Sequence, residues 1–95
     1  MKGYWIAHVT VTDPDQYKFY AEGASLAFRE YGARILARGG KYKQLEGEDH
    51  PRNVVIEVQS FDKAIACYNS PEYQNAKAKR AAAGIAEIVI VEGAE

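Results

Sequence analysis

The apolar residues of this 95-residue chain follow two different periodicities, and the periodicity changes several times along the sequence. Apolar residues at every second position are typical of strands, whereas apolar residues spaced three and four apart are typical of helices. The segments occur in the order strand, helix, strand, strand, helix, strand. This order predicts one α+β domain in which helices cover an antiparallel sheet.

The first strand and the first helix have the clearest boundaries. Residues 3–12 are rich in aromatic and β-branched side chains, with apolar residues at alternate positions. The Asp13 carboxylate can accept a hydrogen bond from the free N–H groups that begin a helix, and Pro14 suits the first helical position. The helix is expected to end near Tyr31, with Gly32 in the left-handed position after it.

The remaining elements are shorter. A second strand is expected at residues 34–38, broken by a glycine pair and continued in part by residues 41–46. A third strand is expected at residues 53–59, where apolar residues alternate cleanly. A second helix over residues 61–83 is interrupted by a serine and a proline, and residues 86–92 form the last strand. Together the elements predict a ferredoxin-like β-α-β-β-α-β sandwich with the first and third strands in the centre of the sheet.

Alternation along the expected strands divides the sheet into two faces. One face is mixed: it carries apolar residues such as Ile6 and Val89 together with polar residues that include His8, Arg38 and Glu57. We expect this mixed face to lie in water or to pack against the sheet of a second copy. The other face is almost purely apolar and is expected to contact the helices; it comprises Trp5, Ala7, Val9, Val11, Ile35, Ala37, Val54, Ile56, Val58, Ile88 and Ile90.

Length, charge and cysteine content limit the function classes. Residues 1–95 suffice for a single domain with a marginal core, which a partner would help to stabilise. The net charge is −1 and the basic residues are spread along the chain, so the sequence predicts no basic patch that could bind nucleic acid. The single Cys67 cannot form an internal disulfide, and the N-terminus does not resemble a secretory signal, so a cytoplasmic location is expected. The longest apolar run, residues 88–91, is far shorter than a membrane span, so no membrane partner is expected.

Several residues are candidates for a pocket, although a structural role explains each of them as well. His8 is the one histidine on an expected strand, where it could act as a base, an acid or a hydrogen-bond anchor oriented by Glu57. Arg80 shares a helical stripe with Tyr73 and could bind a carboxylate or phosphate, or form a structural ion pair. The full candidate set is His8, Arg38, Glu57, Tyr68, Tyr73 and Arg80.

Other kinds of chemistry have weaker support. Arg38, Gly39 and Gly40 could present an arginine and free N–H groups to an anion, but they lack the spacing and the ending of a phosphate loop. Two distant histidines and one cysteine have no metal-ligand spacing, so no metal or cofactor is expected. His50 is expected at the surface in a polar turn. Cys67 lies off the apolar stripe of its helix and has no expected basic partner, which argues against cysteine catalysis. Whether the protein is an enzyme stays open.

Six short segments show a specific order and spacing over the whole chain: Gly3-Tyr4-Trp5-Ile6, Arg38-Gly39-Gly40, Leu45-Glu46-Gly47, Asn53-Val54-Val55-Ile56-Glu57, Tyr68-Asn69-Ser70-Pro71-Glu72-Tyr73 and Val91-Glu92-Gly93. In these segments the chain resembles the DUF1330 family. The resemblance implies a fold of the dimeric α/β-barrel superfamily, in which two ferredoxin-like subunits pack their sheets together. It implies a homodimer but no reaction, since the fold relatives include cofactor-free monooxygenases, isomerases, haem enzymes and stress proteins.

Three function hypotheses follow. The leading one is a homodimer that binds a small organic or anionic molecule, either between the two sheets or in a pocket near Tyr68 and Arg80. An alternative is a cofactor-independent oxygenase or isomerase acting on an aromatic or enol-like molecule, with His8 as base and Arg38 or Arg80 holding the oxyanion. The third is a purely structural or stress-related dimer, which needs no pocket.

Overall fold

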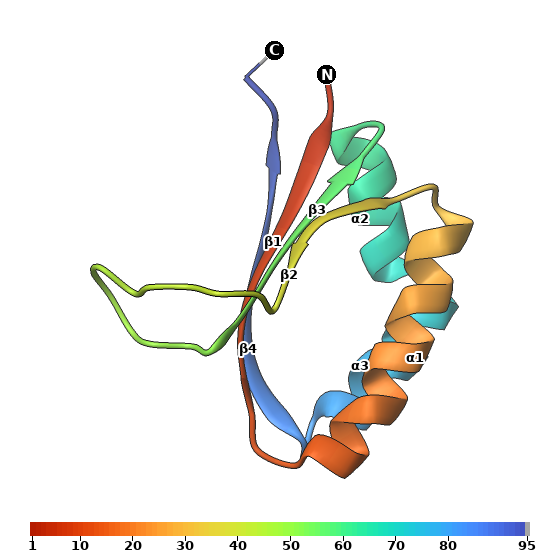
Figure 1. The fold of residues 1–95 in the computed structure, drawn as a ribbon. Coiled ribbons are helices and arrows are strands. Elements are labelled where there is room, and N and C mark those ends of the chain that lie inside the picture. Colours follow the sequence, from red (N-terminus) through yellow and green to blue (C-terminus); the bar gives the residue numbers. More distant parts are fainter. Residues whose placement is uncertain (95) are drawn as a thin grey trace.

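The computed structural model describes residues 1–94 and shows the elements in the expected order (Figure 1). The four strands form one antiparallel sheet in the order β2-β3-β1-β4, and all the helices lie on one side of it. The fold is therefore α+β and ferredoxin-like, as the sequence predicts. The elements are β1 (Gly3–Val11), α1 (Pro14–Glu30), β2 (Arg34–Arg38), β3 (Arg52–Val58), α2 (Phe61–Asn69), α3 (Pro71–Arg80) and β4 (Gly84–Glu92).

Side-chain caps fix the ends of the helices. The Asp13 carboxylate accepts a hydrogen bond from the Gln16 N–H at 3.2 Å, which starts α1. Ser70 both ends α2 and starts α3: its hydroxyl donates to the Cys67 carbonyl at 2.7 Å and accepts from the Tyr73 N–H at 3.2 Å. The break that the sequence predicts in the second helix is thus made by one buried serine.

The core lies between the sheet and the helices, with Trp5 at its centre. Trp5 is only 1% exposed, and its ring centroid lies 4.9 Å from that of Phe28 and 4.8 Å from that of Tyr73, both edge to face. The strand residues expected to contact the helices are buried or packed against this core, with Ala37 as the exception. Phe19 and Leu26 are exposed on the far side of α1.

The register of β2 shifts by one residue between Ile35 and Ala37. Beyond the shift, Arg38 pairs with Val54, whose side chain is buried beneath the helices. A β-bulge of one extra residue reverses the side-chain direction along the rest of the strand. Arg38 therefore lies on the helix-covered face and Ala37 on the outer face, so the faces predicted for these two residues by strict alternation are wrong.

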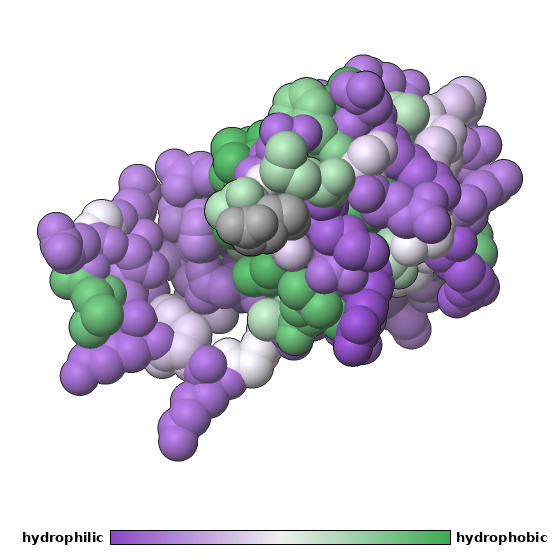
Figure 2. Space-filling view, turned by 90° about the horizontal axis from the view of Figure 1, so that it is seen from above, coloured by the Kyte–Doolittle hydropathy of each residue, from purple (hydrophilic) through white to green (hydrophobic). Residues whose placement is uncertain are grey.

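The connection between β2 and β3, residues 39–51, differs from expectation. Residues 41–46 do not continue the strand; the whole connection leaves the sheet on the side opposite the helices (Figure 1). We call residues 39–51 the arm. In the space-filling view the arm stands away from the rest of the molecule, with hydrophobic side chains near its end (Figure 2). Among its residues, Leu45 is 80% exposed and Tyr42 is 41% exposed.

Tertiary contacts bury two residues that lie outside the predicted apolar stripes, and the surface position predicted for His50 is wrong. Cys67 is fully buried, since α1 covers that flank of α2 and brings the Ala27 carbonyl to 3.8 Å from the thiol sulfur. Burial raises the pKa of Cys67 to about 11, so the thiol stays protonated at neutral pH. His50 is only 3% exposed, because the returning end of the arm places its ring against Thr10 of β1.

Within residues 1–94, no helix combines the length and the apolar character needed to cross a membrane.

Candidate functional site

The residues predicted as candidates lie on both faces of the sheet and do not converge on one site. His8 and Glu57 are on the outer face, where the His8 Nδ1 lies 2.6 Å from the Asn53 Oδ1 and Glu57 lies 3.8 Å from the Lys2 Nζ. The expected orientation of His8 by Glu57 is therefore replaced by a contact with Asn53. The helix side holds the other four: Arg38, Tyr68, Tyr73 and Arg80.

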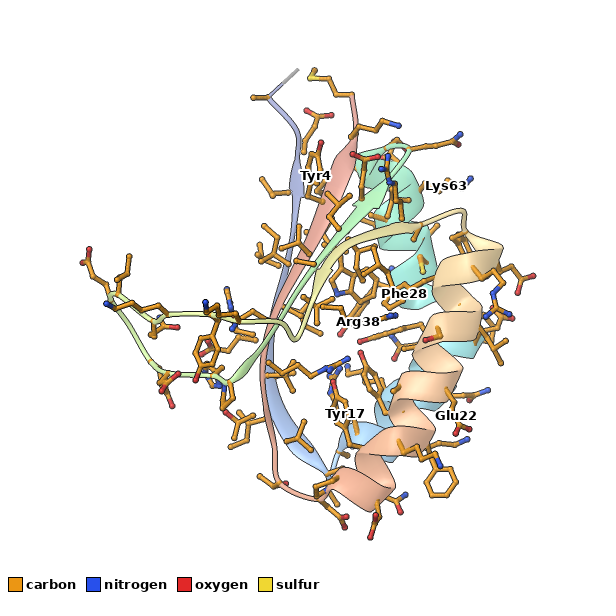
Figure 3. All side chains as sticks on the ribbon, viewed as in Figure 1. Tyr4, Tyr17, Glu22, Phe28, Arg38 and Lys63 are labelled. Atoms are coloured by element: carbon orange, nitrogen blue, oxygen red, sulfur yellow. The ribbon has the colours of Figure 1, made fainter. Side chains whose placement is uncertain are left out.

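A cavity of about 50 Å³ lies between α1 and the sheet. Its inner wall is apolar and includes the rings of Trp5 and Phe28, whereas two arginines, Arg38 and Arg52, also line it. Arg38 is exposed, whereas Arg52 is half-buried and its Nε is fully buried, so the cavity opens to solvent beside Arg38. Figure 3 shows Arg38 from β2 pointing into the space between the sheet and α1, as Tyr17 and Phe28 do from the helix.

The local backbone explains why both arginines reach this cavity. Arg38 faces α1 because of the β-bulge, and Arg52 pairs with Val9, whose side chain is buried on the same face. Gly39 adopts a φ of 63°, which favours glycine, and a Cβ atom there would lie 2.9 Å from an Arg52 guanidinium nitrogen. The glycine after Arg38 thus lets the chain turn into the arm and leaves room for the second arginine.

Arg52 carries an unsatisfied donor. Its Cζ lies 5.6 Å from the centroid of the Tyr17 ring, a cation-π contact. Its Nε is buried and has no hydrogen-bond partner within residues 1–94. Among the carboxylates of residues 1–94, none forms an ion pair with Arg38 or Arg52. A buried donor without a partner costs about 1–3 kcal/mol, so an anion at this position would stabilise the protein.

Arg80 belongs to a tyrosine network next to the cavity. The hydroxyl oxygens of Tyr20 and Tyr73 lie 3.0 Å apart, and an Arg80 Nη1 donates to the Tyr73 hydroxyl at 3.0 Å. The Arg80 Cζ also lies 4.9 Å from the centroid of the Tyr20 ring. No carboxylate within residues 1–94 pairs with Arg80, so the ion pair considered from the sequence is not formed there. In this geometry Arg80 holds phenol hydroxyls rather than facing the cavity.

The tyrosine network makes the fold sensitive to alkaline pH. Burial, with smaller contributions from neighbouring tyrosines, raises the pKa of Tyr17 and Tyr20, and burial is also the main cause of the raised pKa of Tyr73. The folded state therefore holds these protons more tightly than the unfolded chain. The stability they contribute is fully present below the ordinary tyrosine pKa of about 10 and is lost as the pH rises beyond it.

We expect the free energy of unfolding, measured by urea melts, to fall above about pH 10, and the double variant Tyr20→Phe, Tyr73→Phe to show a shallower fall. Leu26→Ala, which changes an exposed side chain of α1 and removes no ionisable group, serves as the control and should keep the wild-type slope. An unchanged slope in the double variant would show that other groups cause the alkaline loss.

Part of this site has a local signal in the sequence. Arg52 has the same parity as Val54, so extending the third strand by one residue places it on the helix side. Tyr17 and Tyr20 belong to the apolar stripe of the first helix, but their place at a cavity depends on how far α1 lies from the sheet. That distance depends on tertiary packing and cannot be predicted from the spacing of apolar residues.

The sequence model of DUF1330, a domain of unknown function, matches residues 2–94. The chain belongs to the DUF1330 family. Comparison with curated proteins found no match. Two of the segments that carry the family resemblance have defined places in this DUF1330 structure. In Arg38-Gly39-Gly40, the arginine ends β2 beside the cavity and the two glycines begin the arm; Ser70-Pro71-Glu72-Tyr73 joins α2 to α3.

Solved structures with the same fold are also similar to the DUF1330 chain. A protein of unknown function from Rhodopseudomonas palustris has a TM-score of 0.80 at 16% identity, over 99% of this chain and 83% of its own. A dimeric ferredoxin-like protein of unknown function from Bacteroides fragilis has a TM-score of 0.64 at 14% identity, over 97% and 96%. SnoaB, a cofactor-independent oxygenase from Streptomyces nogalater, has a TM-score of 0.64 at 11% identity, over 99% and 94%. At these identities the likeness shows the fold of the DUF1330 chain and not its activity.

Proposed function

We propose that the protein binds a small organic anion, a short-chain carboxylate, in the cavity between α1 and the sheet. The carboxylate lies against Arg38 and Arg52, and the alkyl part points toward Trp5 and Phe28. The observation that carries the proposal is the buried Arg52 Nε, which has no hydrogen-bond partner within residues 1–94. An arginine that shares a cavity with a second arginine and lacks an acidic partner is well suited to bind a carboxylate with two hydrogen bonds.

The size of the cavity defines the ligand class. Its volume of about 50 Å³ exceeds the roughly 10–15 Å³ that one water needs. It is far smaller than the roughly 300–1,000 Å³ of sites for drug-sized molecules. The space beyond the arginines therefore fits a few carbon atoms. This limit favours short aliphatic carboxylates over aromatic ones.

The proposal predicts a chain-length dependence of affinity. Along acetate, propionate and butyrate, each added methylene that enters the apolar part of the cavity is expected to tighten binding by about fourfold, corresponding to about 0.8 kcal/mol, until the cavity is full. Arg38→Ala and Arg52→Ala are each expected to weaken propionate binding by about tenfold or more, because each removes a charged hydrogen bond. NMR titration of the backbone amide signals measures both effects.

Arg34→Ala is the matched control, since Arg34 belongs to the same strand but lies on the outer face with Glu57. It should bind propionate like the wild type, and neutral propionamide should not bind. Equal binding of propionate and propionamide would contradict the proposal. So would an Arg34→Ala variant as weak as Arg38→Ala.

A second candidate function is a cofactor-independent oxygenase or isomerase acting on an aromatic or enol-like molecule, which the fold shared with SnoaB supports. This function needs a base near the substrate. Among the described residues that line the cavity there is no histidine or carboxylate, and the raised pKa values of Tyr17 and Tyr20 keep these hydroxyls protonated. His8 lies on the other face. We therefore prefer the carboxylate-binding function to the enzymatic one. Oxygen uptake by the purified protein with a phenol or quinol would instead favour the oxygenase.

We also propose that the protein is a homodimer joined through the outer face of the sheet. Apolar residues form a row across three strands on that face, because Ile6 pairs with Val55 on one side and with Val89 on the other. Val89 is 53% exposed and Leu45 of the arm is 80% exposed. Two structural neighbours of unknown function, from Bacteroides fragilis and Thermobifida fusca, are described as dimeric ferredoxin-like proteins. These observations support a second copy as the cover of this face.

A further inference from the structure

A group of possible metal ligands lies on the outer side of the sheet, away from the cavity. Glu48 and His50 belong to the arm, and Glu87 belongs to β4. One ligand atom from each residue can be chosen so that all of them lie within 4.8 Å of one another. The sequence gives no sign of this group, because Glu87 is far from the other two along the chain and only the return of the arm over the sheet brings them together.

The imidazole of His50 is held in one orientation. The residue is only 3% exposed, and its Nδ1 lies 2.8 Å from the Thr10 Oγ1. The Asn53 amide donates to the His50 carbonyl at 3.0 Å, which fixes the backbone at the same place. Metal-ligating histidines typically have their second ring nitrogen held in this way, because that contact sets the tautomer and the direction of the ring.

The other ring nitrogen, Nε2, is left without a partner. It is buried, makes no hydrogen bond within residues 1–94, and lies 3.3 Å from a carboxylate oxygen of Glu87. If Nδ1 carries the proton and donates it to Thr10, the Nε2 lone pair faces a negatively charged oxygen. If Nε2 carries the proton, that proton has no acceptor in hydrogen-bond geometry. Only the first tautomer leaves the Nε2 lone pair free for a cation, and a cation between Nε2 and Glu87 would then give this buried nitrogen a partner.

We propose that Glu48, His50 and Glu87 bind a divalent transition-metal cation of the Zn²⁺ type. An imidazole nitrogen with two carboxylates suits Zn²⁺, whereas Mg²⁺ and Ca²⁺ prefer oxygen ligands alone. The 3.3 Å between Nε2 and the Glu87 oxygen is close to the separation of about 3.4 Å between tetrahedral ligands with bonds of about 2.0–2.1 Å. Glu48 and Glu87 are exposed, so their side chains can move to complete the geometry. Three protein ligands leave a fourth position for water or another small molecule.

The metal site does not depend on the proposed carboxylate site. The cavity is lined by residues of α1 and by the helix-facing side of the strands, whereas the three ligands lie on the arm side. Loss of one binding activity should therefore leave the other intact.

Isothermal titration with zinc chloride tests the proposal. The wild-type protein is expected to bind one Zn²⁺ per chain with micromolar or tighter affinity, and Glu48→Gln and Glu87→Gln are each expected to weaken binding by about tenfold or more, because each replaces an anionic ligand by a neutral amide. Both residues are exposed, and circular dichroism checks that the variants fold. Glu46→Gln in the arm and Glu92→Gln at the end of β4 are matched controls that should bind as the wild type does.

The proposal fails if the wild type shows no saturable 1:1 binding, which is the result expected when Nε2 only carries a proton and forms an imidazolium–carboxylate pair with Glu87. It also fails if Glu48→Gln and Glu87→Gln bind Zn²⁺ as tightly as the wild type, or if the control variants lose as much affinity. Displacement of Zn²⁺ by an equal concentration of Mg²⁺ would contradict the role of the His50 nitrogen.

Discussion

Replacing Trp5 by alanine is expected to lower the free energy of unfolding by about 3–5 kcal/mol, as for other buried large aromatic residues. Trp5 is 1% exposed, and its ring packs against those of Phe28, Tyr68 and Tyr73, which come from α1, α2 and α3 respectively. Domains of this kind have a total stability of roughly 5–15 kcal/mol, so the variant loses a large share of it. Urea melts followed by circular dichroism measure the change without relying on the fluorescence of the only tryptophan.

Leu26→Ala is the control for a large apolar side chain outside the core, because Leu26 is on the far side of α1 and is 58% exposed. Its free energy of unfolding should stay within about 0.5 kcal/mol of the wild type. If Trp5→Ala were to lose less than about 1 kcal/mol, the core between the sheet and the helices would not be the main source of stability.

Val89→Glu is expected to break the proposed dimer into monomers. Val89 is in the apolar row of the outer face, next to Ile6 across the β1–β4 pair. A two-fold interface carries every substitution twice, so the variant would bury two unpaired carboxylates, each costing several kcal/mol. Light scattering after gel filtration measures the mass: about twice the chain mass of 10.6 kDa for the wild type and a single chain mass for the variant.

Phe19→Glu is the matched control, since it places the same charge on an exposed aromatic residue of α1, on the other side of the molecule. It should remain a dimer. A wild-type protein that elutes as a monomer, or a Val89→Glu variant that stays dimeric, would exclude the outer face as the interface.

The order of the elements could be predicted from the sequence because each one carries a local signal. The cap at Asp13 and the break at Ser70 act through hydrogen bonds to residues a few positions away, and the structure contains them as predicted. Gly32, with a φ of 67°, follows the first helix as expected. Local chemistry of this kind depends on neighbours in the sequence, so one sequence suffices to find it.

The sites were harder to predict, because they depend on contacts between distant segments. The position of His50 in a polar turn indicated a surface residue, yet the arm returns over the sheet and buries its ring against Thr10. Arg80 shares a helical stripe with Tyr73, as the spacing predicts, but its partner is the Tyr73 hydroxyl and not a carboxylate. The unpartnered atoms of Arg52 and His50, which carry both site proposals, can be found only when all of their neighbours are known.

The β-bulge in β2 has a consequence for proteins that share this strand pattern. Without the extra residue, a small apolar side chain would occupy the place beside Val54 where Arg38 now lies, and the charged group would turn toward the other side of the sheet. The count of residues between Ile35 and Arg38, rather than their composition, decides whether an arginine lies at this cavity. Relatives that differ by a single insertion or deletion at this point would keep the fold but present a different side chain to the cavity.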